Sequence, residues 1–228
     1  MYKQSKRYKE ATGKFDNQKK YSLDESISIL KELPKAKFDE TVEVSVRLGL
    51  KKNQRIRGIG ILPHTFGKPK TILVFAKGEK AEEAKKAGAD HVGDNDLIQK
   101  VQKGWSDFQV VIATPDMMKD VSKLGPVLGR KGLMPNPKTG TVTMDLKNAI
   151  QEVKKGKIEF RSDKEGIVGI GVAKVSMDKE KIKENIITFY QSLVKTRPAD
   201  VKGEFLFTFT VSTTMGPGVK IDLNDLQN

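Results

Sequence analysis

The sequence predicts a two-domain α/β protein, in which a discontinuous α+β domain from both chain ends flanks an inserted Rossmann-like three-layer α/β domain. Apolar and polar residues alternate near both ends of the chain, which is typical of strands with one solvated face. Between the ends, short apolar strands alternate with helices, which indicates a parallel sheet covered on both faces. The 228 residues suffice for two domains, which we place at 1–66 with 159–228 and at 67–158.

The first segment predicts one helix followed by two strands. Ser22 and Glu25 have the spacing of a capping box, and leucines and isoleucines follow at helical intervals until Pro34. Valines at every second position predict a strand over 42–48. The isoleucines within 59–61 predict a continuation of this pattern after a basic loop, with their side chains on the buried face.

The middle of the chain changes its pattern. Residues 72–76 and 110–113 are continuously apolar, as expected for strands that are buried on both faces. Gly88 is placed to end the helix that follows the first of these strands. We expect helices at 79–87, 96–103 and 146–154.

The last segment returns to alternation. It predicts strands around 158–161, 168–172 and 205–211, the last with Phe205, Phe207 and Phe209 on its buried face. Between them lies an amphipathic helix whose N-cap we assign to Asp178. Its apolar stripe is formed by Ile182, Ile186, Phe189, Tyr190 and Leu193.

The composition excludes several kinds of site and favours one kind of partner. The chain has no cysteine, which excludes disulfides, thiolate metal sites and cysteine nucleophiles. It has 42 Lys and Arg against 29 Asp and Glu, a formal net charge of +13, which predicts a phosphate-rich partner. No apolar stretch approaches the ~18 residues of a spanning helix and no signal peptide follows the basic start, so we expect a cytoplasmic protein without a membrane partner.

The motifs do not indicate catalysis. Gly132 to Thr139 comes close to a phosphate-binding loop, but Pro137 replaces the second glycine and supplies neither its N–H nor its conformational freedom. The glycine pairs at 58–60 and 169–171 lack a third glycine and lie in alternating strands, which favours bulges or close packing. Neither histidine has metal-ligating neighbours at a suitable spacing. We therefore expect no enzyme, no metal and no cofactor.

Basic and glycine-rich segments are the remaining candidates for function. Lys51, Lys52, Arg55 and Arg57 fall within seven residues that contain no acid. Residues 125–140 predict a long, irregular basic loop, and loops of this kind are usually functional or disordered. The alternative that these cations only keep the surface soluble remains open.

Three separated motifs resemble the L1 family of ribosomal proteins, the first-numbered proteins of the large subunit. They are Lys37 to Glu43, Lys123 to Lys138 and Thr213 to Pro217, in that order. The resemblance extends over nearly the whole chain, since it includes the Arg7-Tyr8 start and the strand at 158–161.

The resemblance implies an interrupted two-domain fold and a binding function. Members of this family bind 23S rRNA in the 50S subunit, form a mobile stalk near the exit site of deacylated tRNA, and in bacteria can repress translation through their own operon mRNA. The resemblance also implies a cytoplasmic, ribosomal location; we further expect the free protein to be a monomer. It places the main rRNA contacts on the terminal domain, at Lys37, Phe38, Thr41, Thr213, Thr214, Met215 and Gly216. The inserted domain is then a secondary contact surface.

Alternatives from other classes remain open at this point. A nucleotide-dependent enzyme could use the inserted α/β domain, and a basic protein could also bind duplex DNA. Phe38 could be a core aromatic residue, and the Thr213 to Gly218 segment could be only a structural turn.

Overall fold

The computed structural model has a mixed α/β architecture with several sheets, and it describes residues 5–33, 36–51, 54–201 and 203–226. Pro34 and Lys52, which the sequence singled out, lie outside the described residues. The chain divides into two compact units. The end unit comprises Met1–Gly67 and Ile158–Asn228, and the insert unit comprises Lys68–Lys157.

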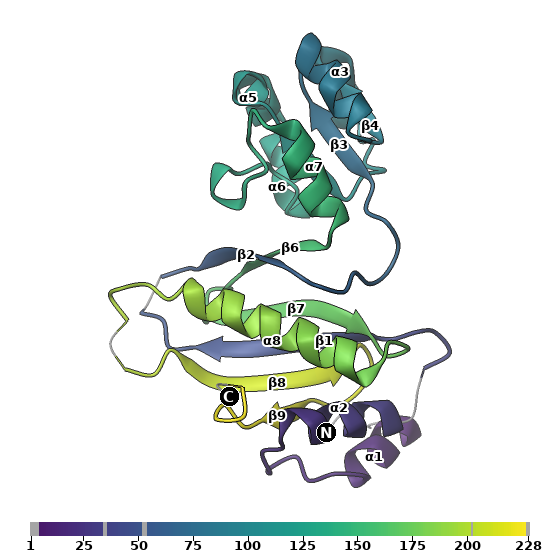
Figure 1. Ribbon diagram of the computed structural model, residues 1–228, viewed down its shortest axis with the longest axis vertical. Helices are drawn as coiled ribbons and strands as arrows, with labels where there is room; N and C mark the ends of the chain where they lie inside the picture. The colour runs from purple at the N-terminus through teal and green to yellow at the C-terminus, as the bar shows by residue number, and fades with distance from the viewer. Residues whose placement is uncertain (1–4, 34–35, 52–53, 202, 227–228) are drawn as a thin grey trace. The chain divides into compact units, whose positions relative to one another are not determined.

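The end unit is built on an antiparallel sheet in the order β7-β1-β8-β9, with helices α2 and α8 packed on it (Figure 1). Its elements are α1 (Lys6–Gly13), α2 (Leu23–Glu32), β1 (Thr41–Leu48), β7 (Ile167–Lys174), α8 (Lys179–Lys195), β8 (Leu206–Thr213) and β9 (Val219–Ile221). The predicted capping box is confirmed, since the Ser22 hydroxyl accepts from the Glu25 N–H and the Glu25 carboxylate accepts from the Ser22 N–H. The alternating valines of β1 are buried, as predicted.

Helix α8 carries the predicted apolar stripe, but its N-terminus differs from the expected cap. All five residues of the stripe are buried in the core of the end unit. Asp178 occupies the N-cap position without a side-chain cap hydrogen bond. Its carboxylate instead lies 2.8 Å from Lys181 Nζ, one turn along the helix. The carboxylate therefore forms an ion pair and no hydrogen bond to the N–H groups of the first turn.

The predicted burial of the isoleucines in 59–61 is wrong. Strand β2 (Arg57–Ile61) pairs with β6 (Lys157–Arg161) in a separate two-stranded sheet, and Ile59 and Ile61 are 39% and 46% exposed. The glycines face the core instead, because a Cβ at Gly58 would lie 2.4 Å from Cζ of Phe160. Thr196 at the end of helix α8 and the Phe160 ring therefore leave no space for a side chain at Gly58.

Phe207 was also expected on the buried face, and it is exposed. Val46 pairs with Phe209 and Arg47 with Thr208, but Leu48 then pairs with Leu206. This shift leaves Phe207 as the extra residue of an irregularity in β8, which turns its side chain away from the core. Phe205 and Phe209 are buried as predicted.

The insert unit is a parallel three-stranded sheet in the order β4-β3-β5, with helices on both faces. Its strands are β3 (Ile72–Phe75), β4 (His91–Gly93) and β5 (Val110–Ala113). Its helices are α3 (Glu79–Lys86), α4 (Asn95–Gln102), α5 (Met118–Val121), α6 (Gly125–Lys131) and α7 (Leu146–Lys154), with short 3₁₀ turns η1 (Pro115–Met117), η2 (Ser122–Leu124) and η3 (Pro137–Thr139). Alternate residues of β3 enter two different cores, one with α3 and α7 and one with α4, α5 and α6. This burial on both faces explains the continuous apolar runs.

The expected irregular loop at 125–140 is largely ordered into short elements. Helix α6 takes up its first half, with Pro126 in the first turn, where the missing N–H costs no hydrogen bond. Gly132 ends that helix with φ 70°, and Gly140 ends η3 with φ 64°. The glycines and prolines therefore begin and end short helices. Composition alone does not distinguish residues with this role from residues of an irregular loop.

Each unit has its own hydrophobic core, which leads to a prediction for a deletion. The buried cluster of the end unit draws no residue from 68–157. We expect that replacing residues 68–157 by a short Gly/Ser linker leaves a cooperatively unfolding domain, and the family resemblance implies that this domain binds rRNA. Urea unfolding and an rRNA-fragment titration test this. A product that fails to fold, or one that folds without binding, would contradict the division of roles.

Candidate nucleic-acid interface

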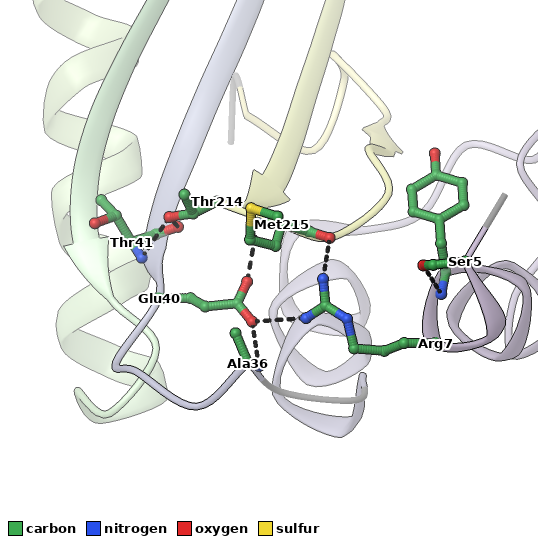
Figure 2. Close-up of polar contacts among 8 residues, drawn as sticks. Ser5, Arg7, Ala36, Glu40, Thr41, Thr214 and Met215 are labelled. Atoms are coloured by element: carbon green, nitrogen blue, oxygen red, sulfur yellow. Dashed lines mark hydrogen bonds and ion pairs between the residues drawn. The ribbon is translucent and has the colours of Figure 1, made fainter. Parts of the chain in front are cut away.

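The two predicted binding segments, 37–41 and 213–216, meet at one end of the end unit's sheet. Strand β1 starts where its antiparallel neighbour β8 ends, so Val42 pairs with Thr213. The Thr214 N–H donates to the Thr41 carbonyl at 3.0 Å, and the Thr41 N–H donates to Thr214 Oγ1 at 2.9 Å (Figure 2). Residues 173 positions apart in the sequence are thus held in a fixed pair by the sheet.

Glu40 organises this corner, although the sequence analysis did not select it. Its side chain is 4% exposed and accepts from the Ala36 N–H at 2.6 Å and from the Met215 N–H at 3.0 Å. Nη1 of Arg7 lies 3.5 Å from the same carboxylate (Figure 2). Glu40 belongs to one of the family motifs, but neighbouring acids in a loop are usually solvated, so only its burial reveals the role.

The surroundings of Glu40 favour its charged form. Burial raises the pKa of this carboxyl, but hydrogen bonds from Thr213, Ala36 and Met215 and the positive charge of Arg7 outweigh burial, so the pKa is lowered. The carboxylate therefore stays ionised and acts as an acceptor for the 213–216 segment and for Ala36, which lies just before the 37–41 segment.

The predicted site residues divide into an exposed group and an internal group. Phe38 and Met215 are 54% and 53% exposed, which excludes the core alternative for Phe38. Lys37 and Thr214 are exposed as well, and Thr41 is half-buried. Thr213 is only 6% exposed and its hydroxyl bonds to Glu40, so this side chain supports the turn from inside.

Position 216 requires a glycine because a side chain there would clash with a neighbour, and not because its backbone is left-handed. The described residues contain nine glycines with positive φ, and Gly216 is not one of them. A Cβ at this position would lie 2.3 Å from Thr213 Oγ1. Because that hydroxyl is buried and bonded to Glu40, it cannot easily move aside.

Lys174 is a further cation at this corner that the sequence reasoning missed. Its Nζ donates to Thr41 Oγ1 at 2.8 Å and to the Asp39 carbonyl at 3.1 Å. The Asp39 carboxylate in turn accepts from the hydroxyl of Ser176 at 2.8 Å. These bonds hold the loop before β1 on the end of β7, a placement that depends on strand pairing and leaves no local signal.

The corner consists of hydrogen-bonded backbone groups, one buried carboxylate and the two exposed apolar side chains of Phe38 and Met215. Over the residues that the structure describes, there is no group of three or more His, Asp or Glu side chains placed to hold a metal ion. His64 Nε2 lies 2.6 Å from the Glu184 carboxylate, and the His91 ring packs against Trp105 at 4.8 Å. None of the described helices is long and apolar enough to cross a membrane.

Fold and site together define a basic, mixed α/β protein with a preorganised polar corner and two exposed apolar tips. Such surfaces suit a phosphate-rich polymer more than a small molecule. The chain belongs to the Ribosomal protein L1p/L10e family, whose model matches residues 30–217. It is therefore a ribosomal protein, a structural and not a catalytic kind of protein.

Close relatives extend over essentially the whole chain. A protein of Borrelia hermsii (strain HS1 / DAH), named large ribosomal subunit protein uL1, is 57% identical over 222 residues, 97% of this chain and 99% of the relative. The protein of the same name from Macrococcus caseolyticus (strain JCSC5402) is 53% identical over 231 residues, all of both chains. The similarity thus includes both units.

The charge on Glu40 predicts a pH dependence of stability. Its pKa is lower in the folded protein, so the unfolded chain takes up the proton first as the pH falls. Its contribution is complete above the usual glutamate range and is lost as the pH falls through the folded-state pKa. We expect Glu40→Gln to lower the free energy of unfolding by about 1–3 kcal/mol at neutral pH, because the amide turns a donor toward a backbone N–H.

Urea unfolding of both proteins at neutral and at acidic pH measures this effect. The difference between wild type and Glu40→Gln should shrink at the acidic pH. Glu165→Gln, on an exposed loop, is the control and should change little at either pH. An equal difference at both pH values would show that the charge of Glu40 is unimportant.

Proposed function

We propose that the protein is a constituent of the large ribosomal subunit that binds 23S rRNA through the corner formed by 37–41 and 213–216. The observation that carries this proposal is the meeting of the two family motifs in one hydrogen-bonded corner around Glu40, with Phe38 and Met215 exposed at its tips. The exposed Lys37 ammonium and Thr214 hydroxyl of a rigid corner suit phosphates and riboses, and exposed apolar tips suit bases or sugars. The shape of the folded RNA would then be what is recognised.

The two units have different roles in this proposal. The discontinuous domain, 1–66 with 159–228, is the rRNA-binding domain, and its connection to the insert through two chain crossings allows relative movement. The inserted domain, 67–158, is Rossmann-like in its three layers and serves as a secondary contact surface. It supplies no nucleotide-hydrolysing loop, because Pro137 starts the turn η3 where such a loop needs a glycine.

The wider roles follow from the family to which the chain belongs. The protein forms a mobile stalk in the 50S subunit, assists release of deacylated tRNA from the exit site, and represses translation by binding its own operon mRNA. It acts in the cytoplasm on the ribosome, is a monomer when free, and works without a cofactor or metal. Crosslinking to total RNA followed by sequencing tests the rRNA and mRNA partners together.

Binding to rRNA should draw its free energy partly from close contacts at the corner and partly from long-range attraction between lysines and phosphates. Changing one pair of lysines tests the second contribution. Lys51 is exposed, and Lys52 lies beside it in the sequence, outside the described residues. Changing both to Gln should weaken binding to an rRNA fragment modestly. It should also reduce the salt dependence, by about one unit of slope for each phosphate that the variant no longer neutralises.

Titrations at several salt concentrations measure this slope. The control changes Lys85 and Lys86 to Gln, an exposed pair on the glutamate-rich helix α3, and should leave the slope as it is. Equal slopes for both double variants would remove the 51–52 pair from the interface. Equal affinity of the wild type for DNA and RNA duplexes, or nucleotide turnover without RNA binding, would overturn the proposed function itself.

A further inference from the structure

The N-terminal helix α1 is attached to the end unit by polar contacts, and those of Arg7 reach the corner formed by 37–41 and 213–216. Ala11 is the one buried residue of this eight-residue helix, so apolar packing holds it only weakly. Its N-cap is local, since the Ser5 hydroxyl accepts from the Tyr8 N–H at 3.3 Å. At its other end, Lys14 Nζ donates to the Glu32 carbonyl at 2.9 Å.

Arg7 makes the connection between this helix and the corner. Its Nη2 donates to the Met215 carbonyl at 3.1 Å, and its Nη1 lies 3.5 Å from Glu40 Oε1 (Figure 2). Glu40 Oε2 meanwhile accepts from the Met215 N–H at 3.0 Å. Both backbone polar groups of Met215 are therefore held, one by a guanidinium and the other by a buried carboxylate that the guanidinium neutralises.

A planar guanidinium suits this bridge better than an ammonium. It presents several N–H donors in a fixed fork, so one side chain can satisfy a carbonyl and a carboxylate at once. The Arg7 side chain is 32% exposed, and its two contacts lie 33 and 208 residues away in the sequence. No local pattern of helix α1 encodes such contacts.

We propose that Arg7 is a positioning residue for RNA binding: it holds the 213–216 turn in its binding shape and makes helix α1 a part of the RNA-binding surface. The exposed Lys6 and Lys9 of the same helix then add long-range attraction to phosphate. This inference rests on the proposed function, and it assigns a role to the basic start of the chain.

The test compares two cation-removing changes on one helix. Arg7→Gln should weaken binding to an rRNA fragment by about tenfold or more at every salt concentration, because the bonds it removes lie within the protein. Lys9→Gln should weaken binding slightly and flatten the salt dependence. Arg7→Lys should recover part of the affinity, and in a double-mutant cycle the effects of Arg7→Gln and Glu40→Gln should be less than additive.

A second measurement needs no RNA. Amide hydrogen exchange of Met215, followed by NMR, should accelerate in Arg7→Gln and stay unchanged in Lys9→Gln, with both proteins folded. If Arg7→Gln only flattens the salt slope as Lys9→Gln does, Arg7 is an ordinary phosphate contact and the inference fails. Unchanged Met215 exchange also overturns it. Failure of the wild type to bind rRNA would instead overturn the proposed function, whatever the exchange shows.

Discussion

Replacing Met215 by Asp should abolish most specific binding to an rRNA fragment, at a cost on the order of 2 kcal/mol or more at any salt concentration. The side chain is 53% exposed at the tip of the corner, so the change should not disturb the core. A carboxylate there faces phosphate and ribose without a partner. It also lies near the buried charge of Glu40, which already accepts from the Met215 N–H.

Filter binding or calorimetry of folded protein measures the loss, and a second methionine provides the control. Met144 is 49% exposed and belongs to the insert unit, so Met144→Asp makes the same chemical change in the other unit. It should bind within about threefold of wild type, since isolated surface changes cost within about 0.5 kcal/mol. If Met215→Asp binds as well as Met144→Asp, the 213–216 turn is only a structural turn.

Gly216→Val should have a comparable effect on binding and a larger one on stability. The new Cβ would start 2.3 Å from Thr213 Oγ1, which is buried against Glu40. Either the turn opens or Thr213 leaves Glu40, and both results displace Met215 from its place. We expect a loss of RNA affinity on the order of 2 kcal/mol or more, together with a lower melting temperature.

Gly169→Val separates this steric effect from a general intolerance to valine. Gly169 lies in β7 of the same sheet, and its added Cβ would meet only Ser45 Oγ, at 3.9 Å. A β-branched residue fits an extended strand, so binding and melting temperature should stay near wild type. Wild-type binding by Gly216→Val would show that the space around Thr213 is not required.

The sequence by itself determined most local structure in this protein. The capping box of α2, the alternating valines of β1 and the apolar run of β3 all depend on short-range geometry, which the residues encode directly. The net charge of +13 and the three ordered motifs likewise identified the class of partner and the family before any contact was known. The predicted segments 37–41 and 213–216 do lie together.

Only the tertiary structure decided which side chains are buried where two elements meet. Ile59 and Ile61 are exposed because Phe160 occupies the space over Gly58, and Phe207 is exposed because β8 gains a residue against β1. In β2 the period of two was predicted correctly, but a distant neighbour set the face; in β8 the face was predicted correctly, but the added residue breaks the period at Phe207. A periodic pattern specifies alternation, whereas the choice of face depends on the partner that covers it.

The same reason explains why the centre of the binding corner was missed. Glu40 was one acid among several in the sequence, and its importance lies in four donors that come from residues 7, 36, 213 and 215. A buried carboxylate is stable only when such donors converge on it. Their convergence is created by the antiparallel pairing of β1 with β8 and by the position of α1, so it exists only once the chain has folded.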